Sequence, residues 1–144
     1  MIPGIHTATT LWMEAGGMSG PPAHRHQIEF SNDLAEFFDD TARETEIIHM
    51  RLPGEPLYPR PLTYRGMDYG QWTDIWRLGL LTPRMGGPAY VGRIIRIDKV
   101  TEGGQIIYEL RVADAGSADA TDWAARSHHQ SVTGGPGGRR FGFR

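Results

Sequence analysis

Two stretches of alternating apolar and charged residues constrain the fold more than any other feature of the chain. In 91–100 and in 105–113, apolar side chains recur at every second position, with Arg, Asp or Glu between several of them. This spacing places the apolar side chains on one face of a strand and the charged side chains on the other. Two glycines lie between the stretches and can adopt the positive φ of a tight turn. We expect a β-hairpin over 91–113, with Ile97 facing the core, and a further short strand at Ile47–Leu52.

The segment Asn32–Thr45 has the spacing of an amphipathic helix. Its apolar side chains recur every three or four residues, and acidic side chains occupy much of the opposite face. Ser31 or Asp33 can cap the first turn, where acidic side chains also interact favourably with the helix dipole. We expect a helix over these residues, with Phe37 in the core.

Two further helices are predicted. One runs from about Asp119 to His129, with Asp119 as its cap and Trp123 facing the core. The other is Gly70–Leu78, in which Trp72 and Trp76 share one face and a glycine follows the last turn. Because each indole can bury about 200 Å², this pair is expected to pack in the core or against a partner.

Turn-forming residues are frequent, with 19 Gly and 10 Pro among 144 residues. Four prolines cluster in 53–66, and since each lacks a backbone donor, we expect an extended surface connection there, neither a helix nor a central strand. Residues 1–26 and the Gly/Arg-rich tail 131–144 are predicted to be extended arms. The prediction for 1–144 is therefore one small α+β domain, with an antiparallel sheet centred on the 91–113 hairpin, two amphipathic helices and terminal arms.

Composition and charge exclude several classes of protein. The chain has no Cys, which excludes disulfides and thiolate metal sites. No apolar run approaches the ~18 residues of a membrane span, and no secretory signal opens the chain, so we expect a protein of the cytoplasm or of a virus particle, without a membrane partner. The net charge is −2, but 1–50 carries eight acidic and two basic side chains, whereas 51–144 carries nine acidic and thirteen basic ones. Such an asymmetry favours contacts between copies or with a charged partner.

His24, His26 and Glu29 are the candidate metal ligands. Two histidines two residues apart on a strand point the same way, and a following carboxylate can complete a metal site. The segment is similar to the first cupin motif, although its spacings are shorter and no second motif with its own histidine follows. A metal site there is therefore an alternative, and the main prediction is that the protein holds no metal and no other cofactor.

Asp98, Glu109 and Arg111 lie on the charged face of the predicted hairpin. Their order is similar to the acid, then acid-x-base pattern of PD-(D/E)xK nucleases, in which two carboxylates bind a divalent metal ion. Arg111 stands where that pattern has lysine, and no βαβ unit follows. We expect ion pairs across the hairpin rather than a nuclease site.

The C-terminal tail is the main candidate for contact with a partner. After a Gly-rich stretch, aromatic and basic side chains alternate as in a short strand that adds to the edge of a sheet, in this chain or in a neighbour. We expect deletion of 137–144 to weaken assembly and to leave the stability of the monomer nearly unchanged. The predicted partner-binding residues are Arg139, Arg140, Phe141, Phe143, Arg144, Trp72 and Trp76.

The function expected from the sequence is that of a non-enzymatic structural or adaptor subunit of a larger assembly, such as a virus particle. Its partners would be other protein subunits, in a homo-oligomer or a hetero-oligomer. The alternative is a protein that binds or processes nucleic acid through the Arg-rich C-terminal half. A second alternative is a small metal-dependent enzyme at His24, His26 and Glu29.

Overall fold

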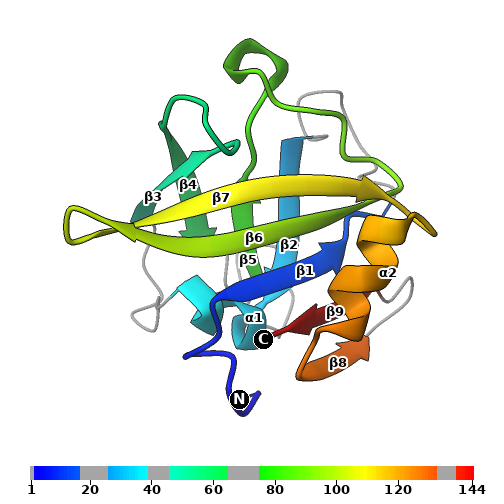
Figure 1. Ribbon diagram of the computed structural model, residues 1–144. Helices are drawn as coiled ribbons and strands as arrows, with labels where there is room; N and C mark the ends of the chain where they lie inside the picture. The colour runs from blue at the N-terminus through cyan, green and yellow to red at the C-terminus, as the bar shows by residue number, and fades with distance from the viewer. Residues whose placement is uncertain (1, 17–25, 39–45, 65–74, 133–138) are drawn as a thin grey trace.

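The computed structural model describes residues 2–16, 26–38, 46–64, 75–132 and 139–144. Nine strands form one curled mixed sheet in the order β2-β5-β4-β3-β7-β6-β1-β9-β8 (Figure 1). The strands are β1 (Thr10–Glu14), β2 (Gln27–Ser31), β3 (Glu46–Arg51), β4 (Tyr58–Tyr64), β5 (Ile75–Gly79), β6 (Arg93–Glu102), β7 (Gln105–Asp114), β8 (His129–Val132) and β9 (Arg140–Phe143). The helical elements are α1 (Asn32–Ala35), the 3-10 helices η2 (Glu36–Phe38) and η3 (Pro83–Met85), and α2 (Ala118–Ala125).

The prediction of a small α+β domain is wrong, because the protein is mostly β. In the part of the chain that the structure describes, α2 is the one helix longer than a single turn, with eight residues. Neighbouring strands are antiparallel except β3 and β7, which are parallel. The segments that we expected to be terminal arms, a surface connection and a helix contain β1, β9, β4 and β5. Because these strands pair within the same sheet, the protein has more β-structure than predicted.

The β6–β7 hairpin confirms the strongest sequence prediction. Arg93–Glu102 pairs with Gln105–Asp114 along its whole length, from Arg93 opposite Asp114 to Glu102 opposite Gln105. The two residues of the turn, Gly103 and Gly104, have φ of 57° and 78°, which side chains other than glycine rarely adopt. Ile97 is 1 % exposed and faces the core, as expected.

The Pro-rich segment 53–66 contains a central strand, contrary to the prediction. Strand β4 pairs with β3 along Pro59 and Pro61, and its ladder with β5 begins after Pro61. Because these prolines are two residues apart, their nitrogen atoms point to the same side of the strand. The Pro61 ring lies against Gly79, where an added Cβ would be 3.0 Å from Cδ of Pro61. The prolines therefore face the side of β4 that carries no ladder at this point, and the donors of the other residues remain for β3.

Two of the predicted helices are present but differ from the prediction in their limits. Residues 32–38 are helical as α1 and η2, with Phe37 fully buried, whereas 39–45 lie outside the described residues. The helix expected from Asp119 is present as α2, but it ends at Ala125, and His129 already belongs to β8. Its N-cap is Ser117, whose Oγ accepts a hydrogen bond from Ala120 N at 3.2 Å.

The prediction of a helix over Gly70–Leu78 is wrong for residues 75–78, which are the part of this range that the structure describes. Ile75–Gly79 is strand β5, and Trp76 and Leu78 are fully buried on either side of Arg77, which pairs with Glu29. This is the period of two that belongs to a strand. Trp72 lies outside the described residues.

The predicted terminal arms are not free arms in their described parts, because each contributes a strand to the interior of the sheet. β1 lies between β6 and β9, and β9 lies between β1 and β8. Phe141 and Phe143 of β9 are 4 % and 3 % exposed. The two ends of the chain therefore form adjacent strands, and the C-terminal strand belongs to the core of its own domain.

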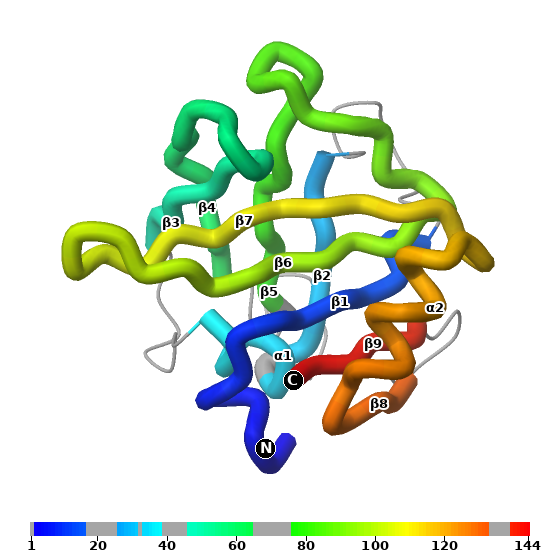
Figure 2. Tube along the Cα trace, viewed as in Figure 1, coloured from blue at the N-terminus to red at the C-terminus, as the bar shows by residue number. Residues whose placement is uncertain are grey.

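The apolar residues form two clusters on opposite faces of the sheet. The larger cluster fills the inner face of the curl, where β6, β7 and β1 cross in front of β4, β5 and β2 (Figure 1). The smaller cluster lies on the outer face and consists of Trp12, Ile94, Ala113 and Trp123, with Ala120 and Ala124 packed against it. It joins α2 to the sheet, beside the ends of β1 and β9 (Figure 2). Within the described ranges, no helix is long and apolar enough to cross a membrane.

Candidate binding surface on the outer face of the sheet

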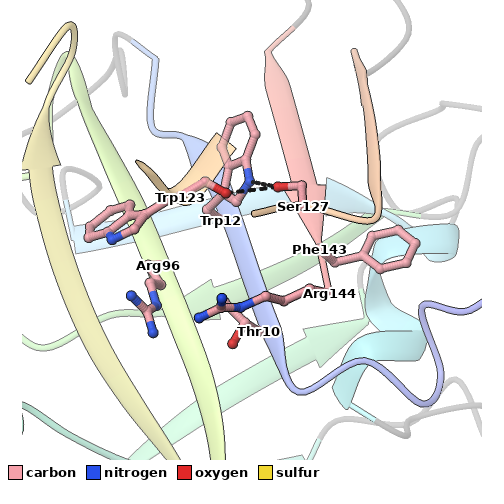
Figure 3. A pocket seen from close by; sticks show the side chains of 7 residues that line it. All are labelled: Thr10, Trp12, Arg96, Trp123, Ser127, Phe143 and Arg144. Carbon is pink, nitrogen blue, oxygen red and sulfur yellow. Dashed lines mark hydrogen bonds between the residues drawn. The ribbon is translucent and has the colours of Figure 1, made fainter. Parts of the chain in front are cut away.

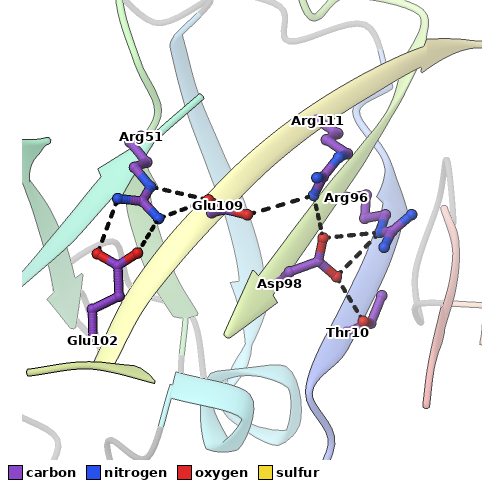
Figure 4. Close-up of polar contacts among 7 residues, drawn as sticks. All are labelled: Thr10, Arg51, Arg96, Asp98, Glu102, Glu109 and Arg111. Carbon is purple, nitrogen blue, oxygen red and sulfur yellow. Dashed lines mark hydrogen bonds and ion pairs between the residues drawn. The ribbon is translucent and has the colours of Figure 1, made fainter. Parts of the chain in front are cut away.

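Charged side chains form a row across the outer faces of β6, β7 and β3 (Figure 4). The alternation predicted from the sequence places them there, since their neighbours along β6 and β7 face the core. Thr10 of β1 ends the row. We define the outer row by the residues Arg51, Arg96, Asp98, Glu102, Glu109 and Arg111.

Asp98 is the most buried carboxylate of the outer row, with 9 % of its surface exposed. Its Oδ1 accepts a hydrogen bond from Thr10 Oγ1 at 2.6 Å, and its Oδ2 accepts one from Arg111 Nη1 at 2.6 Å. Arg96 Nε donates to the same carboxylate at 3.1 Å. Two guanidinium groups and a hydroxyl thus compensate the charge and satisfy the acceptors of this carboxylate.

Glu109 and Glu102 are paired with Arg51 at the other end of the outer row. Arg51 Nε donates to Glu109 Oε2 at 3.0 Å, and its two terminal nitrogens donate to both oxygens of Glu102 at 2.7 and 3.1 Å. These bonds raise the pKa of Arg51 and lower that of Glu102. Asp98 and Glu109 face each other across the hairpin, as the nuclease pattern requires, but both carboxylates are bound by arginines. Their geometry is that of an ion-pair network.

Two tryptophans, Trp12 of β1 and Trp123 of α2, stand near Arg96 of the outer row (Figure 3). Trp12 Nε1 donates to Ser127 Oγ at 2.6 Å, and Ser127 Oγ donates to the carbonyl of Trp123 at 2.9 Å. The Trp12 ring lies so close to β9 that an added Cβ at Gly142 would be 2.6 Å from its Nε1. A glycine at 142 is therefore required for this packing.

Two arginines line a small cavity between these indoles and β1. The cavity has a volume of about 10 Å³ and is lined by Thr10, Trp12, Arg96, Trp123, Ser127, Phe143 and Arg144. The guanidinium carbon of Arg96 lies 5.5 Å from the centre of the Trp123 ring, a cation–π contact. Figure 3 shows the Arg144 side chain extending past Thr10 toward Arg96. Among the described residues, the Arg144 side chain has no hydrogen bond and no ion pair.

The predicted metal ligands are not assembled into a site in the described part of the chain. Glu29 Oε1 is bound by Arg77 Nη2 at 2.6 Å, and His24 lies outside the described residues. The His26 ring stands edge-on to Tyr90 with ring centres 6.3 Å apart, and its buried Nδ1 has no hydrogen-bond partner among the described residues. Across the described ranges, no three His, Asp or Glu side chains are placed to hold a metal ion.

Two of the predicted partner-binding arginines contact β1. Arg139 donates from Nη1 to the carbonyl of Glu14 at 3.4 Å and from Nη2 to the carbonyl of Glu29 on β2. Burial lowers the pKa of Arg139, although both glutamates act in the opposite direction. Arg140 is 64 % exposed and its Nε lies 3.5 Å from Glu14 Oε1. Arg139 therefore connects one edge strand of the sheet to β1, whereas the Arg140 side chain is largely in solvent.

The predicted aromatic residues contact their own chain. Trp76, Phe141 and Phe143 belong to the inner apolar cluster, and the His129 ring stacks on Phe143 with ring centres 4.9 Å apart. These side chains stabilise the fold of the chain itself.

Sequence reasoning missed Trp12, Arg96 and Arg144 as a group. The three residues lie on β1, β6 and immediately after β9, so no local spacing connects them. The available signal was the run Leu11-Trp12-Met13, whose apolar side chains point alternately to the two faces of a strand buried on both sides. A scan of protein-family models finds none that matches the chain, and a search of curated proteins finds no match.

Proposed function

We propose that the protein is a non-enzymatic structural subunit that assembles with other protein subunits, including copies of itself, through the outer edge of β8. The proposal places it in the cytoplasm or in a virus particle. What supports it is the difference between the two edges of the sheet. An exposed edge strand offers unpaired backbone groups to a strand of another chain.

The β2 edge is partly covered. Arg139 donates a hydrogen bond from its guanidinium to the carbonyl of Glu29, in the middle of this strand. A strand approaching β2 would have to displace this bond and so remove one of the acceptors of a half-buried cation. Adding a strand at this edge is therefore unfavourable.

The β8 edge is open along the described residues. Arg144 N donates to Thr10 O and Thr10 N donates to Arg144 O, at 3.1 and 3.2 Å, so Arg144 faces β1. Because backbone groups alternate along a strand, the residues of β9 that face β8 are Phe141 and Phe143. Their partners are Ser131 and His129, which leaves the N–H and C=O groups of Gln130 and Val132 pointing away from the sheet.

The side chains along this edge suit an interface. Gln130, Ser131 and Val132 are all exposed, and Val132 is 57 % exposed, the highest value among the large apolar residues described. Val132 lies opposite Arg140, whose guanidinium is also largely in solvent. None of these β8 side chains is charged, so two copies can approach without repulsion along the strand.

Substitution of Val132 by proline tests the proposal. Proline removes an N–H that faces away from β9, so the ladder within the chain keeps its donors. Since each lost backbone hydrogen bond is worth ~0.5–1.5 kcal/mol, we expect the dissociation constant for self-association to rise about tenfold or more. The melting temperature of dilute protein should stay unchanged. Sedimentation equilibrium from about 1 µM to about 1 mM covers the binding free energies concerned, about −8 to −4 kcal/mol.

Two control variants separate the edge from the fold. Val132→Thr keeps both the N–H and the branched shape, and should associate like the wild type. Ser131→Pro removes a donor that faces β9, and should lower the melting temperature of the monomer. A wild-type protein that remains monomeric over the whole range would contradict the proposal.

Nucleic acid is the alternative partner, and the exposed Arg140 guanidinium is the observation that favours it. Binding to a phosphate backbone releases counterions, so its affinity would fall steeply with salt, whereas edge-strand pairing would change little. A steep salt dependence of binding to DNA or RNA, abolished by Arg140→Gln, would identify this alternative.

A further inference from the structure

We infer that Arg96 and Arg144 form a binding site for a small oxyanion, such as a phosphate or a carboxylate, at the cavity between Trp12 and Trp123. This site is independent of the edge of β8 and does not rest on the proposed function.

The side chains that line the cavity carry two positive charges and no negative charge. Arg96 shares the carboxylate of Asp98 with Arg111, so this carboxylate is already bound by two guanidinium groups. Arg144 lines the same cavity and has no carboxylate partner among the described residues. Two guanidinium groups that approach one another repel, and an anion between them relieves that repulsion.

The free hydrogen-bond donors at the cavity are guanidinium N–H groups. The Thr10 hydroxyl donates to Asp98, and the Ser127 hydroxyl donates to the Trp123 carbonyl while accepting from Trp12. Arg96 uses its Nε for Asp98, and its two terminal nitrogens are the donors that remain. Guanidinium groups donate hydrogen bonds and accept none, so the ligand must supply acceptors. A cation does not fit.

The surroundings favour one oxygen atom of an oxyanion in the cavity. Its volume of about 10 Å³ is close to the space of one water molecule. The indoles of Trp12 and Trp123 form apolar walls that strengthen charge–charge interactions. The rest of the anion would remain at the mouth, within reach of both guanidinium groups.

Arg96 is held in place before any ligand arrives, and Arg144 is held at its backbone. Arg96 is fixed by its bond to Asp98 and by its contact with the Trp123 ring. The backbone of Arg144 is fixed by the paired bonds to Thr10, and its carbonyl also accepts from Thr9 N at 2.9 Å. Such positioning reduces the entropy lost on binding.

The test is a titration of the full chain with inorganic phosphate, followed by the indole N–H signals of Trp12 and Trp123 in NMR spectra. We expect saturable shifts of both signals and a saturable rise in melting temperature. Sodium chloride at equal ionic strength should give neither. A parallel titration with acetate distinguishes a phosphate site from a carboxylate site. Absence of saturation with both anions, or equal effects of chloride, would overturn the inference.

Arg144→Gln is the decisive variant, with Arg126→Gln as its matched control. Arg126 also loses one positive charge, but it lies outside the cavity and is paired with Asp122. Losing one charge-assisted hydrogen bond should weaken anion binding about 10- to 100-fold in Arg144→Gln, and Arg126→Gln should bind like the wild type.

A measurement without anion separates binding from a structural role. Because Arg144→Gln removes a like charge from beside Arg96, its melting temperature without anion should equal or exceed that of the wild type. A lower value would show that Arg144 serves the fold rather than a ligand. Equal weakening by Arg126→Gln would reveal a general charge effect and would contradict the site.

Discussion

A chain lacking Arg139–Arg144 is expected to be unfolded under conditions in which the full chain is stable. The deletion removes β9, which pairs with both β1 and β8. It also removes Phe141 and Phe143, both in the inner apolar cluster. Since truncation of one buried Phe to Ala costs ~3–5 kcal/mol and domains are stable by ~5–15 kcal/mol, the combined loss exceeds what the fold can tolerate.

Circular dichroism and thermal melting of dilute protein measure this outcome. Arg140→Ala, which alters the same strand but no buried side chain, should retain the melting temperature of the wild type to within a few degrees. The sequence alone led to the opposite expectation, a tail that can be deleted from the monomer without effect. A cooperative transition of the truncated chain near the wild-type temperature would restore that interpretation and refute the placement of β9.

Phe37→Ala is expected to lower the free energy of unfolding by ~3–5 kcal/mol. Phe37 is fully buried, its ring is edge-on to Phe38 with centres 5.1 Å apart, and Lys99 Nζ lies 4.4 Å from its centre. The substitution would therefore remove apolar burial and aromatic contacts, and would leave the partly buried ammonium of Lys99 without this ring. Urea denaturation of the variant and the wild type gives the difference.

Ile106→Ala is the matched control for this substitution. Ile106 belongs to the same sheet but is 42 % exposed, so its truncation should cost less than ~1 kcal/mol. A loss below ~1 kcal/mol for Phe37→Ala would mean that η2 does not pack against the sheet.

The elements that were predicted correctly are those whose sequence pattern lies within the element itself or next to it. The β6–β7 hairpin has an alternating pattern on both sides of two glycines, and α2 has one apolar face, although its cap is Ser117 and not the predicted Asp119. β3 was also predicted, one residue away from its observed limits. In each case the residues that determine the element lie within it or next to it, so that the pattern could be read without knowing its neighbours.

The elements that were missed, and β9, which was expected only as a strand added to a sheet edge, depend on residues far away in the sequence. The sequence of β1 does not alternate between apolar and polar residues, because both faces of the strand are buried. Trp12 is buried under α2 on the outer face, and Leu11 and Met13 are buried on the inner face. β9 is short and contains Gly142, a poor strand former that is needed here because Trp12 lies against it. A central strand can contain prolines in β4 because its ladder with β5 begins only after Pro61, so the side that faces β5 is unpaired at both prolines. The local sequence does not reveal this.

The candidate sites were predicted only in part. The charged face of the hairpin was expected to form ion pairs, and the contacts of Asp98 and Glu109 follow that expectation. The cavity with Arg96 and Arg144 joins the middle of the hairpin to the end of the chain, and only the pairing of β9 with β1 brings the two arginines together.

Residue-resolved amide hydrogen exchange at low and high protein concentration tests the central claim most directly. β8 pairs with β9 on one side. On its other side, we propose that it pairs with another copy of the chain. We expect slow exchange of the Ser131 amide at both concentrations, since this N–H faces β9. The Gln130 and Val132 amides should exchange fast in dilute protein and become protected as concentration rises. Equal exchange of these two amides at both concentrations, or a Ser131 amide that exchanges as fast as Val132, would contradict this arrangement of β8.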